Sequence, residues 1–173
     1  MTRTKPPWHE TVAFPALLRH ARNTYGNAMR AALAEIGCDD MPSNGMWVVG
    51  RLANSEGGEP LPLSDLIRDL AMSKQAAGQL VDALVLRRYL ERQIDPGDRR
   101  RLILTLTTRG RAAAAAQTKA RERLDAALAE KVGEKCVRAA RQALAVLIAI
   151  GKQENGEEAD EWLPSTASKT ATR

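Results

Sequence analysis

The hydrophobic residues of this chain recur at helical spacing over most of its length. Residues 14–36 carry apolar side chains every three or four positions, which predicts an amphipathic helix that ends at Gly37. Residues 46–52 form a second apolar stretch and predict a short buried helix, with Ser43 and Asn44 as its candidate caps. The first third of the chain is therefore expected to be helical.

Two short helices are predicted next, after a Gly- and Pro-rich loop over residues 54–62. Apolar residues mark one face of a helix over residues 63–70, with Ser64 as its expected N-cap. After a break at residues 71 and 72, Ser73 is expected to cap a second helix. The inner face of this second helix carries Ala77, Leu80, Val81 and Leu84, and its outer face carries Gln75, Gln79 and Asp82. Two tightly joined helices with these faces predict a helix-turn-helix.

A change to strand periodicity follows the second helix. Residues 89–94 and 101–106 flank the sequence Asp-Pro-Gly-Asp at 95–98, where Pro and Gly at the central positions favour a type II turn. Apolar and other residues alternate along residues 101–106, so the two segments predict a β-hairpin. The tip and the returning strand carry three consecutive arginines, Arg99, Arg100 and Arg101. A charge run is usually only a solvated face, but its position beside the helix-turn-helix favours a functional role.

The C-terminal part reads as two alanine-rich helices. Thr107 and Thr108 open a long helix that reaches Ala129, and Gly133 permits a break before a last helix. The apolar positions of the last helix are Val137, Ala140, Leu144, Leu147 and Ile148. Helices of this kind leave an uncovered apolar stripe, so they are expected to pack against each other or against a second copy of the chain.

Size and composition narrow the class of protein. With 173 residues the chain can bury one sizeable core, which excludes a large multidomain enzyme. Its formal net charge of +5 makes a polyanion, above all nucleic acid, the leading partner. Cys38 and Cys136 have neither disulfide-framework nor metal-ligand spacing, which favours a reducing cytoplasm. Residues 1–10 lack a signal-peptide profile, and no apolar run reaches membrane-spanning length.

Features of an enzyme active site are missing from the sequence. It has no paired carboxylates in a catalytic setting, no nucleophile elbow, no phosphate-cradling glycine loop and no metal-ligand cluster. His9 and His20 are read as ordinary surface or capping groups. Neither enzymatic activity nor a metal or other cofactor is therefore expected.

A series of short motifs follows one colinear order between residues 73 and 110: SKQA at 73–76, LVD at 80–82, LER at 90–92, DPGDRR at 95–100, and Leu106-Thr107 with Gly110. These motifs resemble those of the MarR family of winged helix-turn-helix regulators. The resemblance implies a mainly α fold with a small β-hairpin, in which N- and C-terminal helices form a dimerisation region. It also implies a homodimeric transcriptional regulator, expected to be a repressor that a small-molecule effector releases from a pseudo-palindromic operator.

This interpretation divides the chain into five segments. They are an N-terminal extension at 1–10, a dimerisation helix at 11–42, a DNA-binding winged helix-turn-helix at 43–110, dimerisation helices at 111–152 and a flexible acidic and polar tail at 153–173. The expected partners are double-stranded DNA, a second copy of the chain and a small apolar or phenolic effector, with no membrane.

Polar side chains near the N-terminal end of the second helix are the candidates for reading DNA in the major groove. They are Ser73, Lys74, Gln75, Ala76 and Gln79. Glutamine can pair bidentately with adenine, lysine can hold phosphate or guanine, and Ala76 can touch a thymine methyl group. An exposed glutamine is by itself an ordinary surface residue, so this assignment depends on the motif around it.

The hairpin supplies the candidate wing contacts. Arg100 is expected to enter the minor groove, and Arg99 and Arg101 are expected to contact phosphates. The resemblance implies that Asp98 orients the arginines rather than touching DNA. The sequence departs from the family at three positions: Ala83 replaces an arginine that often pairs with the wing aspartate, Gly78 replaces a small hydroxyl residue, and Arg88 replaces a glycine.

Other candidate residues have competing interpretations. Tyr25, Met46 and Trp47 could line an effector pocket between the dimerisation helices and the DNA-binding lobe, but their apolar stripes favour core positions. Cys38 could be a redox switch only if its thiol has a lowered pKa. A winged-helix module that binds RNA or a protein is the alternative function, although the short polar face of the 73–86 helix lacks aromatic stacking residues.

Overall fold

The computed structural model describes residues 6–55, 60–70 and 72–155, and it is mainly helical with one small sheet, as expected. The helices are α1 (Trp8–Thr11), α2 (Phe14–Glu35), α3 (Ser43–Ala53), α4 (Leu63–Leu70), α5 (Lys74–Leu86), α6 (Thr108–Val132) and α7 (Glu134–Asn155). The strands are β1 (Leu61–Pro62), β2 (Leu90–Ile94) and β3 (Leu102–Leu106), in the antiparallel order β1-β3-β2.

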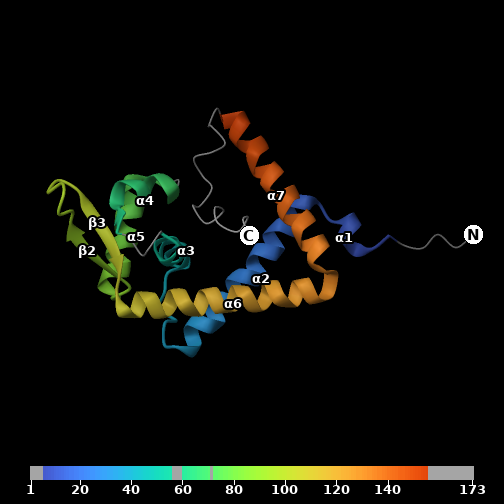
Figure 1. Ribbon diagram of the computed structural model, residues 1–173, viewed down its shortest axis with the longest axis horizontal. Coiled ribbons are helices and arrows are strands. Elements are labelled where there is room, and N and C mark those ends of the chain that lie inside the picture. The colour runs from blue at the N-terminus through green and yellow to red at the C-terminus, as the bar shows by residue number, and fades with distance from the viewer. Residues whose placement is uncertain (1–5, 56–59, 71, 156–173) are drawn as a thin grey trace, which may run out of the picture.

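Helix α6 is the rod that connects the two ends of the molecule (Figure 1). At its N-terminal end lies a lobe made of α3, α4, α5 and the sheet, and at its C-terminal end the chain turns into α7, which contacts α6. Helix α2 crosses α6 and packs against it. Within the described part of the chain, none of the helices combines the length and apolarity needed to cross a membrane.

Helix α2 confirms the first expected element, including its end. Gly37 has φ +69°, its N–H donates to the Ala34 carbonyl at 3.1 Å, and the Cys38 N–H donates to the Leu33 carbonyl at 2.9 Å. This pair of bonds is a Schellman cap, which needs a left-handed residue and so explains the glycine.

The start of α3 corrects the expected caps. Ser43 is already helical, the N-cap is Pro42, and no side chain caps the helix, so the expectation for Ser43 and Asn44 is wrong. The Pro42 carbonyl instead accepts the N–H groups of Gly45 and Met46 at 2.8 and 3.3 Å. Pro42 has φ −58°, close to the value that the proline ring imposes.

The stretch before α4 contains a strand where a loop was expected. Leu61 and Pro62 pair with Leu104 and Ile103 of β3, and the buried Leu61 side chain joins the core. Residues 56–59 of the expected loop lie outside the described residues. Helix α4 starts at Leu63, directly after β1, so Ser64 already lies inside the helix and the expected cap is also wrong. The Ser64 hydroxyl lies 3.5 Å from the neighbouring Asp65 carboxylate.

The hairpin is confirmed, but its turn lies three residues later than expected. The Arg101 N–H donates to the Asp98 carbonyl at 2.9 Å, which puts Arg99 and Arg100 at the two central turn positions. Gly97 is not among the described residues with positive φ, so a type II turn at 95–98 is wrong. The carboxylates of Asp95 and Asp98 accept the N–H groups of residues 97 and 100 at 2.8 and 3.0 Å. These Asx turns shape the loop without a left-handed residue.

The two C-terminal helices agree with expectation at their junction and differ at the end. Thr107 caps α6 by accepting the Gly110 N–H at 3.0 Å, and Gly133 separates α6 from α7 with φ +80°. Helix α7 extends through Asn155, so the expected tail does not begin at residue 153. Residues 156–173 of the expected tail lie outside the described residues.

One continuous core joins the winged lobe to the C-terminal part of α2 and the first half of α6. Val48, Val49, Leu84 and Tyr89 of the helix-turn-helix lobe cluster with Leu33 from α2, all at most 1% exposed. The cluster also includes Ala113 and Ala114 from the first half of α6. The helix-turn-helix lobe is therefore packed firmly on α2 and α6.

Candidate nucleic-acid interface

The expected reading residues gather at the N-terminal end of α5. Ser73 caps this helix by accepting the Ala76 N–H at 3.2 Å, as predicted. Lys74, Gln75 and Gln79 are exposed and Ala76 is half-buried, whereas the opposite face buries Ala77, Val81 and Leu84. Burial of that opposite face fixes which side of α5 is presented outward.

The three wing arginines are all exposed at or next to the tip of the hairpin. The Arg100 side chain is 95% exposed, and its Nε lies 3.7 Å from the Asp98 carboxylate, which also accepts the Arg100 backbone N–H. Asp98 thus contacts Arg100 through both backbone and side chain. This placement fits the orienting role that the resemblance implies for Asp98, and the arginine that Asp98 contacts is Arg100.

An ion pair that the sequence interpretation missed joins the wing to α5. Arg92 on β2 lies 2.6 Å from Asp82 on the outer face of α5. Because residue 83 is alanine, the family's arginine pairing with the wing aspartate is not available here. The Asp82–Arg92 pair supplies a different link between the same two elements, at a typical net gain of at most about 1 kcal/mol for an exposed pair.

The turn between α5 and β2 is tight and partly strained. Arg88 has φ +60°, a left-handed conformation that costs a non-glycine residue about 1 to 2 kcal/mol. This conformation explains why glycine suits the position in the family. Next to it, a Cβ on Gly110 would lie 2.1 Å from the Tyr89 carbonyl oxygen, so α6 approaches the start of β2 as closely as backbones allow.

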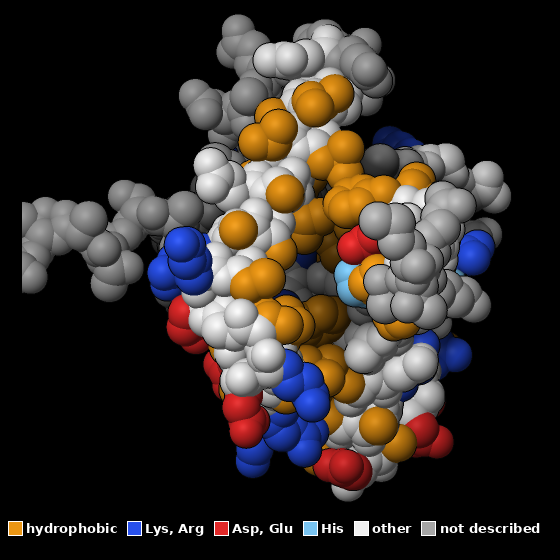
Figure 2. All heavy atoms as spheres, turned by 90° about the vertical axis from the view of Figure 1, so that its right-hand side faces the viewer, with side chains coloured by type: hydrophobic (Ala, Val, Ile, Leu, Met, Phe, Trp, Pro, Cys, Tyr) orange, Lys and Arg blue, Asp and Glu red, His pale blue; other side chains and the backbone are white. Residues whose placement is uncertain are grey.

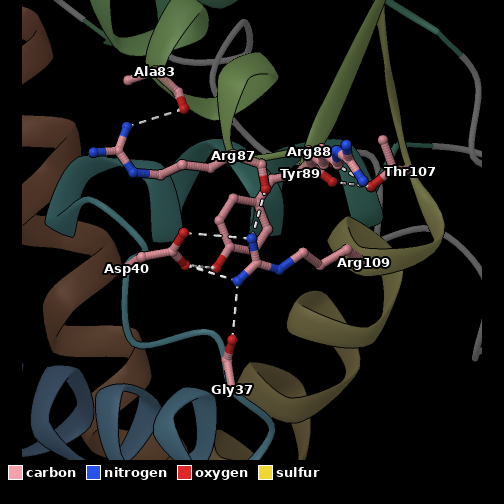
Figure 3. Close-up of polar contacts among 8 residues, drawn as sticks. All are labelled: Gly37, Asp40, Ala83, Arg87, Arg88, Tyr89, Thr107 and Arg109. Atoms are coloured by element: carbon pink, nitrogen blue, oxygen red, sulfur yellow. Dashed lines mark hydrogen bonds and ion pairs between the residues drawn. The ribbon is translucent and has the colours of Figure 1, made fainter.

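A polar cluster behind this turn was not anticipated from the sequence; we call it the Arg109 junction and define it as Gly37, Asp40, Arg87, Tyr89 and Arg109 (Figure 3). The Arg109 guanidinium donates to the Gly37 and Arg87 carbonyls at 2.9 and 2.7 Å and to both Asp40 carboxylate oxygens at 2.9 and 3.4 Å. Its Cζ lies 4.4 Å from the centre of the Tyr89 ring. The Tyr89 hydroxyl donates to Asp40 at 2.5 Å.

The junction favours the charged form of its carboxylate. The hydrogen bond from the Tyr89 hydroxyl, followed by the bond and charge of Arg109, lowers the pKa of Asp40 despite partial desolvation. Burial and the bond to Asp40 raise the pKa of Tyr89. Tyr89 therefore stays a neutral hydrogen-bond donor to an ionised Asp40 at neutral pH.

The opposite end of the molecule exposes an apolar surface. Figure 2 shows hydrophobic side chains spread over this end and lining a hollow beside them. The exposed large apolar residues there are Trp8, Phe14, Leu128, Val132, Leu144, Val146, Leu147, Ile148 and Ile150. The Tyr25 hydroxyl and Arg141 both donate to Asp125, which connects α2, α6 and α7 beneath this surface.

The candidate effector residues do not share one environment. Met46 is 8% exposed and belongs to the core, Trp47 is 40% exposed, and Tyr25 is half-buried against Asp125. A groove of about 1070 Å³ lies elsewhere, between the end of α3, the wing strands and α6, and none of these three residues lines it.

The cysteines are free in the structure. Cys38 is 2% exposed and lies against Tyr89 and Arg109, and Cys136 is exposed. In the part of the chain that the structure describes, His, Cys, Asp and Glu side chains form no group of three suited to a metal ion.

Comparison with known proteins agrees with this geometry. Residues 40–101, from the α2–α3 loop to the hairpin tip, match the family model described as MarR family. No curated protein sequence matches the chain.

Solved structures share the fold at low sequence identity. The crystal structure of MarR has a TM-score of 0.64 and 19% identity, covering 90% of this chain and 97% of its own. S. aureus MepR in its DNA-binding conformation has a TM-score of 0.62 and 17% identity, covering 80% and 98%. Transcriptional regulator Tm0710 from Thermotoga maritima has a TM-score of 0.53 and 21% identity, covering 84% and 98%.

These structures correspond to the whole described arrangement and not only to its winged-helix lobe. Residues 40–101 are therefore similar to the MarR family, and the described arrangement shares the fold of these solved structures.

Proposed function

We propose that the chain acts in the cytoplasm as a homodimer that binds a pseudo-palindromic operator and represses transcription until a small apolar or phenolic molecule releases it. The observation that carries this proposal is the placement of two exposed polar surfaces on one lobe. The N-terminal end of α5 and the arginine turn of the wing both face outward, and the Asp82–Arg92 ion pair ties their elements together. A helix suits the major groove, and an arginine turn suits the adjacent minor groove.

The apolar end of the molecule supports the proposed homodimer. Large exposed apolar patches on a protein mark association surfaces. In α7, Leu144, Val146, Leu147, Ile148 and Ile150 are each between 38% and 54% exposed. A second copy would cover these side chains with the same surface and would present two recognition helices to successive major grooves.

Gln75→Ala is expected to relax base preference at one operator position by about 1 to 3 kcal/mol, because a bidentate contact to a base edge is lost. The measurement is a competition among duplexes that differ at single positions. Gln142→Ala, an exposed glutamine on α7, is the matched control and should leave base preference unchanged.

Arg100→Ala is expected to weaken operator binding at least tenfold and to reduce discrimination for A·T pairs under the wing, since the minor-groove side chain is lost. Arg101→Ala should weaken operator and scrambled duplexes alike, because phosphate contacts carry no sequence information. Unchanged operator affinity in both Gln75→Ala and Arg100→Ala would contradict this mode of docking.

A binding module for RNA or protein remains the competing function. It would be favoured by equal, strongly salt-dependent binding to every duplex together with tighter binding to a single-stranded RNA.

A further inference from the structure

We propose that Arg109 is a positioning residue that fixes the recognition helix α5 against the dimerisation helix α2, and thereby sets the operator half-site spacing that the dimer accepts. Arg109 lies in the first turn of α6, and its guanidinium lies between Asp40, Gly37 and the Arg87–Tyr89 turn (Figure 3). The inference rests on the proposed dimeric, operator-binding function.

Both terminal nitrogens of the Arg109 guanidinium are bonded within the junction. Its two terminal nitrogens make four contacts, with the Gly37 carbonyl, the Arg87 carbonyl and the two oxygens of Asp40. Two parallel bonds between arginine and a carboxylate impose a defined plane on the guanidinium. The Tyr89 ring beneath it and the Tyr89 hydroxyl on Asp40 hold that plane in place.

The two carbonyls come from the C-terminal ends of two helices. Arg87 is the C-cap of α5, and Gly37 directly follows the C-cap of α2. A cation is stabilising at helix C-termini because unpaired carbonyls concentrate negative charge there. One guanidinium on α6 therefore joins the end of the recognition helix to the end of a dimerisation helix.

The Asp40–Arg109 pair is a polar, directional part of the connection between the winged lobe and the dimerisation helices. Among the ion pairs of described residues, Asp65–Arg68, Asp82–Arg92 and Asp98–Arg100 stay within the winged lobe, and Asp125–Arg141 stays within the dimerisation helices. The Asp40–Arg109 pair is the one that joins α6 to the α2–α3 loop. Thr107, the N-cap of α6, adds hydrogen bonds to the Arg88 and Tyr89 carbonyls, on the α5 side of the junction. The hydrophobic side chains of the shared core add packing that is not directional.

A small rotation at this point is amplified at the DNA. Helix α5 has 13 residues. At about 1.5 Å per residue it is about 20 Å long, so a tilt of about 10° about its C-terminal end moves its N-terminal end by about 3.4 Å. That displacement equals about one base-pair step along the duplex. The junction therefore determines which half-site spacing the two recognition helices match.

The test measures how affinity depends on half-site spacing, using the palindromic duplex that the wild-type protein enriches from a random pool. Wild type, Arg109→Met and Arg111→Met are titrated on that duplex, on versions with one or two base pairs inserted or removed at its centre, and on a single half-site. Arg111 is the matched control because it lies on the same helix and bonds only locally, to the Leu106 carbonyl and Thr108 hydroxyl.

We expect Arg109→Met to lose about tenfold affinity at the native spacing, to flatten the spacing profile and to keep single half-site affinity within about twofold. Arg111→Met should keep the wild-type profile. A variant that merely destabilised the fold would lower binding to every duplex alike, so an equal loss on full and half sites would overturn the inference, as would an unchanged spacing profile.

Asp40→Asn provides a second route should Arg109→Met fold poorly. It replaces the Asp40 carboxylate, which pairs with Arg109, by a neutral side chain of the same shape, and it should flatten the same spacing profile. The double variant Asp40→Asn with Arg109→Met should lose no more affinity at the native spacing than either single variant. Absence of any spacing preference in the wild type would overturn the proposed function together with this inference, whereas a wild-type preference retained by Arg109→Met overturns the inference alone.

Discussion

Leu147→Glu is expected to convert the proposed dimer into a monomer. Leu147 is 43% exposed and lies on the apolar face of α7, where a second copy would cover it. An interface anchor contributes about 2 kcal/mol or more, and each dimer carries the change twice. The expected loss of about 4 kcal/mol raises the dimer dissociation constant several hundredfold. Sedimentation equilibrium over a range of protein concentrations measures this shift directly.

The Leu147→Glu variant should also bind the operator more weakly, because a monomer engages only one half-site. Leu86→Glu is the matched control, since Leu86 is 82% exposed at the C-terminal end of α5, outside the apolar end of the molecule. Leu86→Glu should leave the mass measured by sedimentation equilibrium at that of the wild-type protein. A dimeric Leu147→Glu protein would show that the α7 face is not the dimer interface.

Gly110→Ala is expected to cause a large loss of stability, although it adds only one methyl group. The added Cβ would lie 2.1 Å from the Tyr89 carbonyl oxygen and 3.1 Å from the Leu106 side chain. Since the first clash is with backbone, relief requires α6 to shift from the sheet, at a cost of about 3 kcal/mol or more. For a chain of this length that corresponds to a fall in Tm of about 6 to 12 °C.

Gly50→Ala is the control for this substitution. Gly50 is a helical residue of α3, and a methyl group added there would have nothing within 4 Å, so alanine should be neutral or stabilising by up to about 1 kcal/mol. Thermal unfolding of the two variants checks the difference. Equal unfolding temperatures would contradict the close approach of α6 to the start of β2.

Elements governed by local patterns could be predicted from the sequence. The three- and four-residue spacing in 14–36 located α2 to within one residue, because one side of that helix packs against α6. Ser73 and Thr107 were predictable as the start of α5 and α6, because a cap depends only on residues within one turn. The outward side of α5 followed from the apolar residues on its other side.

Elements that depend on distant partners were missed or misplaced. Strand β1 has two residues and exists only because it pairs with β3, which lies far along the chain. In the hairpin, Asp95 and Asp98 replaced the glycine-based turn by accepting nearby N–H groups, a competition that dipeptide preferences do not resolve.

The candidate site shows the same division. The exposed residues of α5 and the wing were anticipated because motif and periodicity both pointed to them. The Arg109 junction was not, since Gly37 and Arg109 are 72 positions apart and an arginine in a first helical turn carries no signal of its partner. Asp82 and Arg92 both lay within recognised motifs, but their pairing depends on how the wing folds back on α5.

Sequence-specific binding of duplex DNA by a dimer is best tested with the intergenic DNA upstream of the protein's own coding sequence. The purified protein is titrated on this duplex and on a scrambled duplex of equal composition at two salt concentrations, with the mass of the complex measured in parallel. We predict a preference for the native duplex that persists at the higher salt, formed by a complex containing two chains. Equal binding to both duplexes that disappears as salt rises would mean that only charge is recognised, and it would contradict operator recognition by this protein.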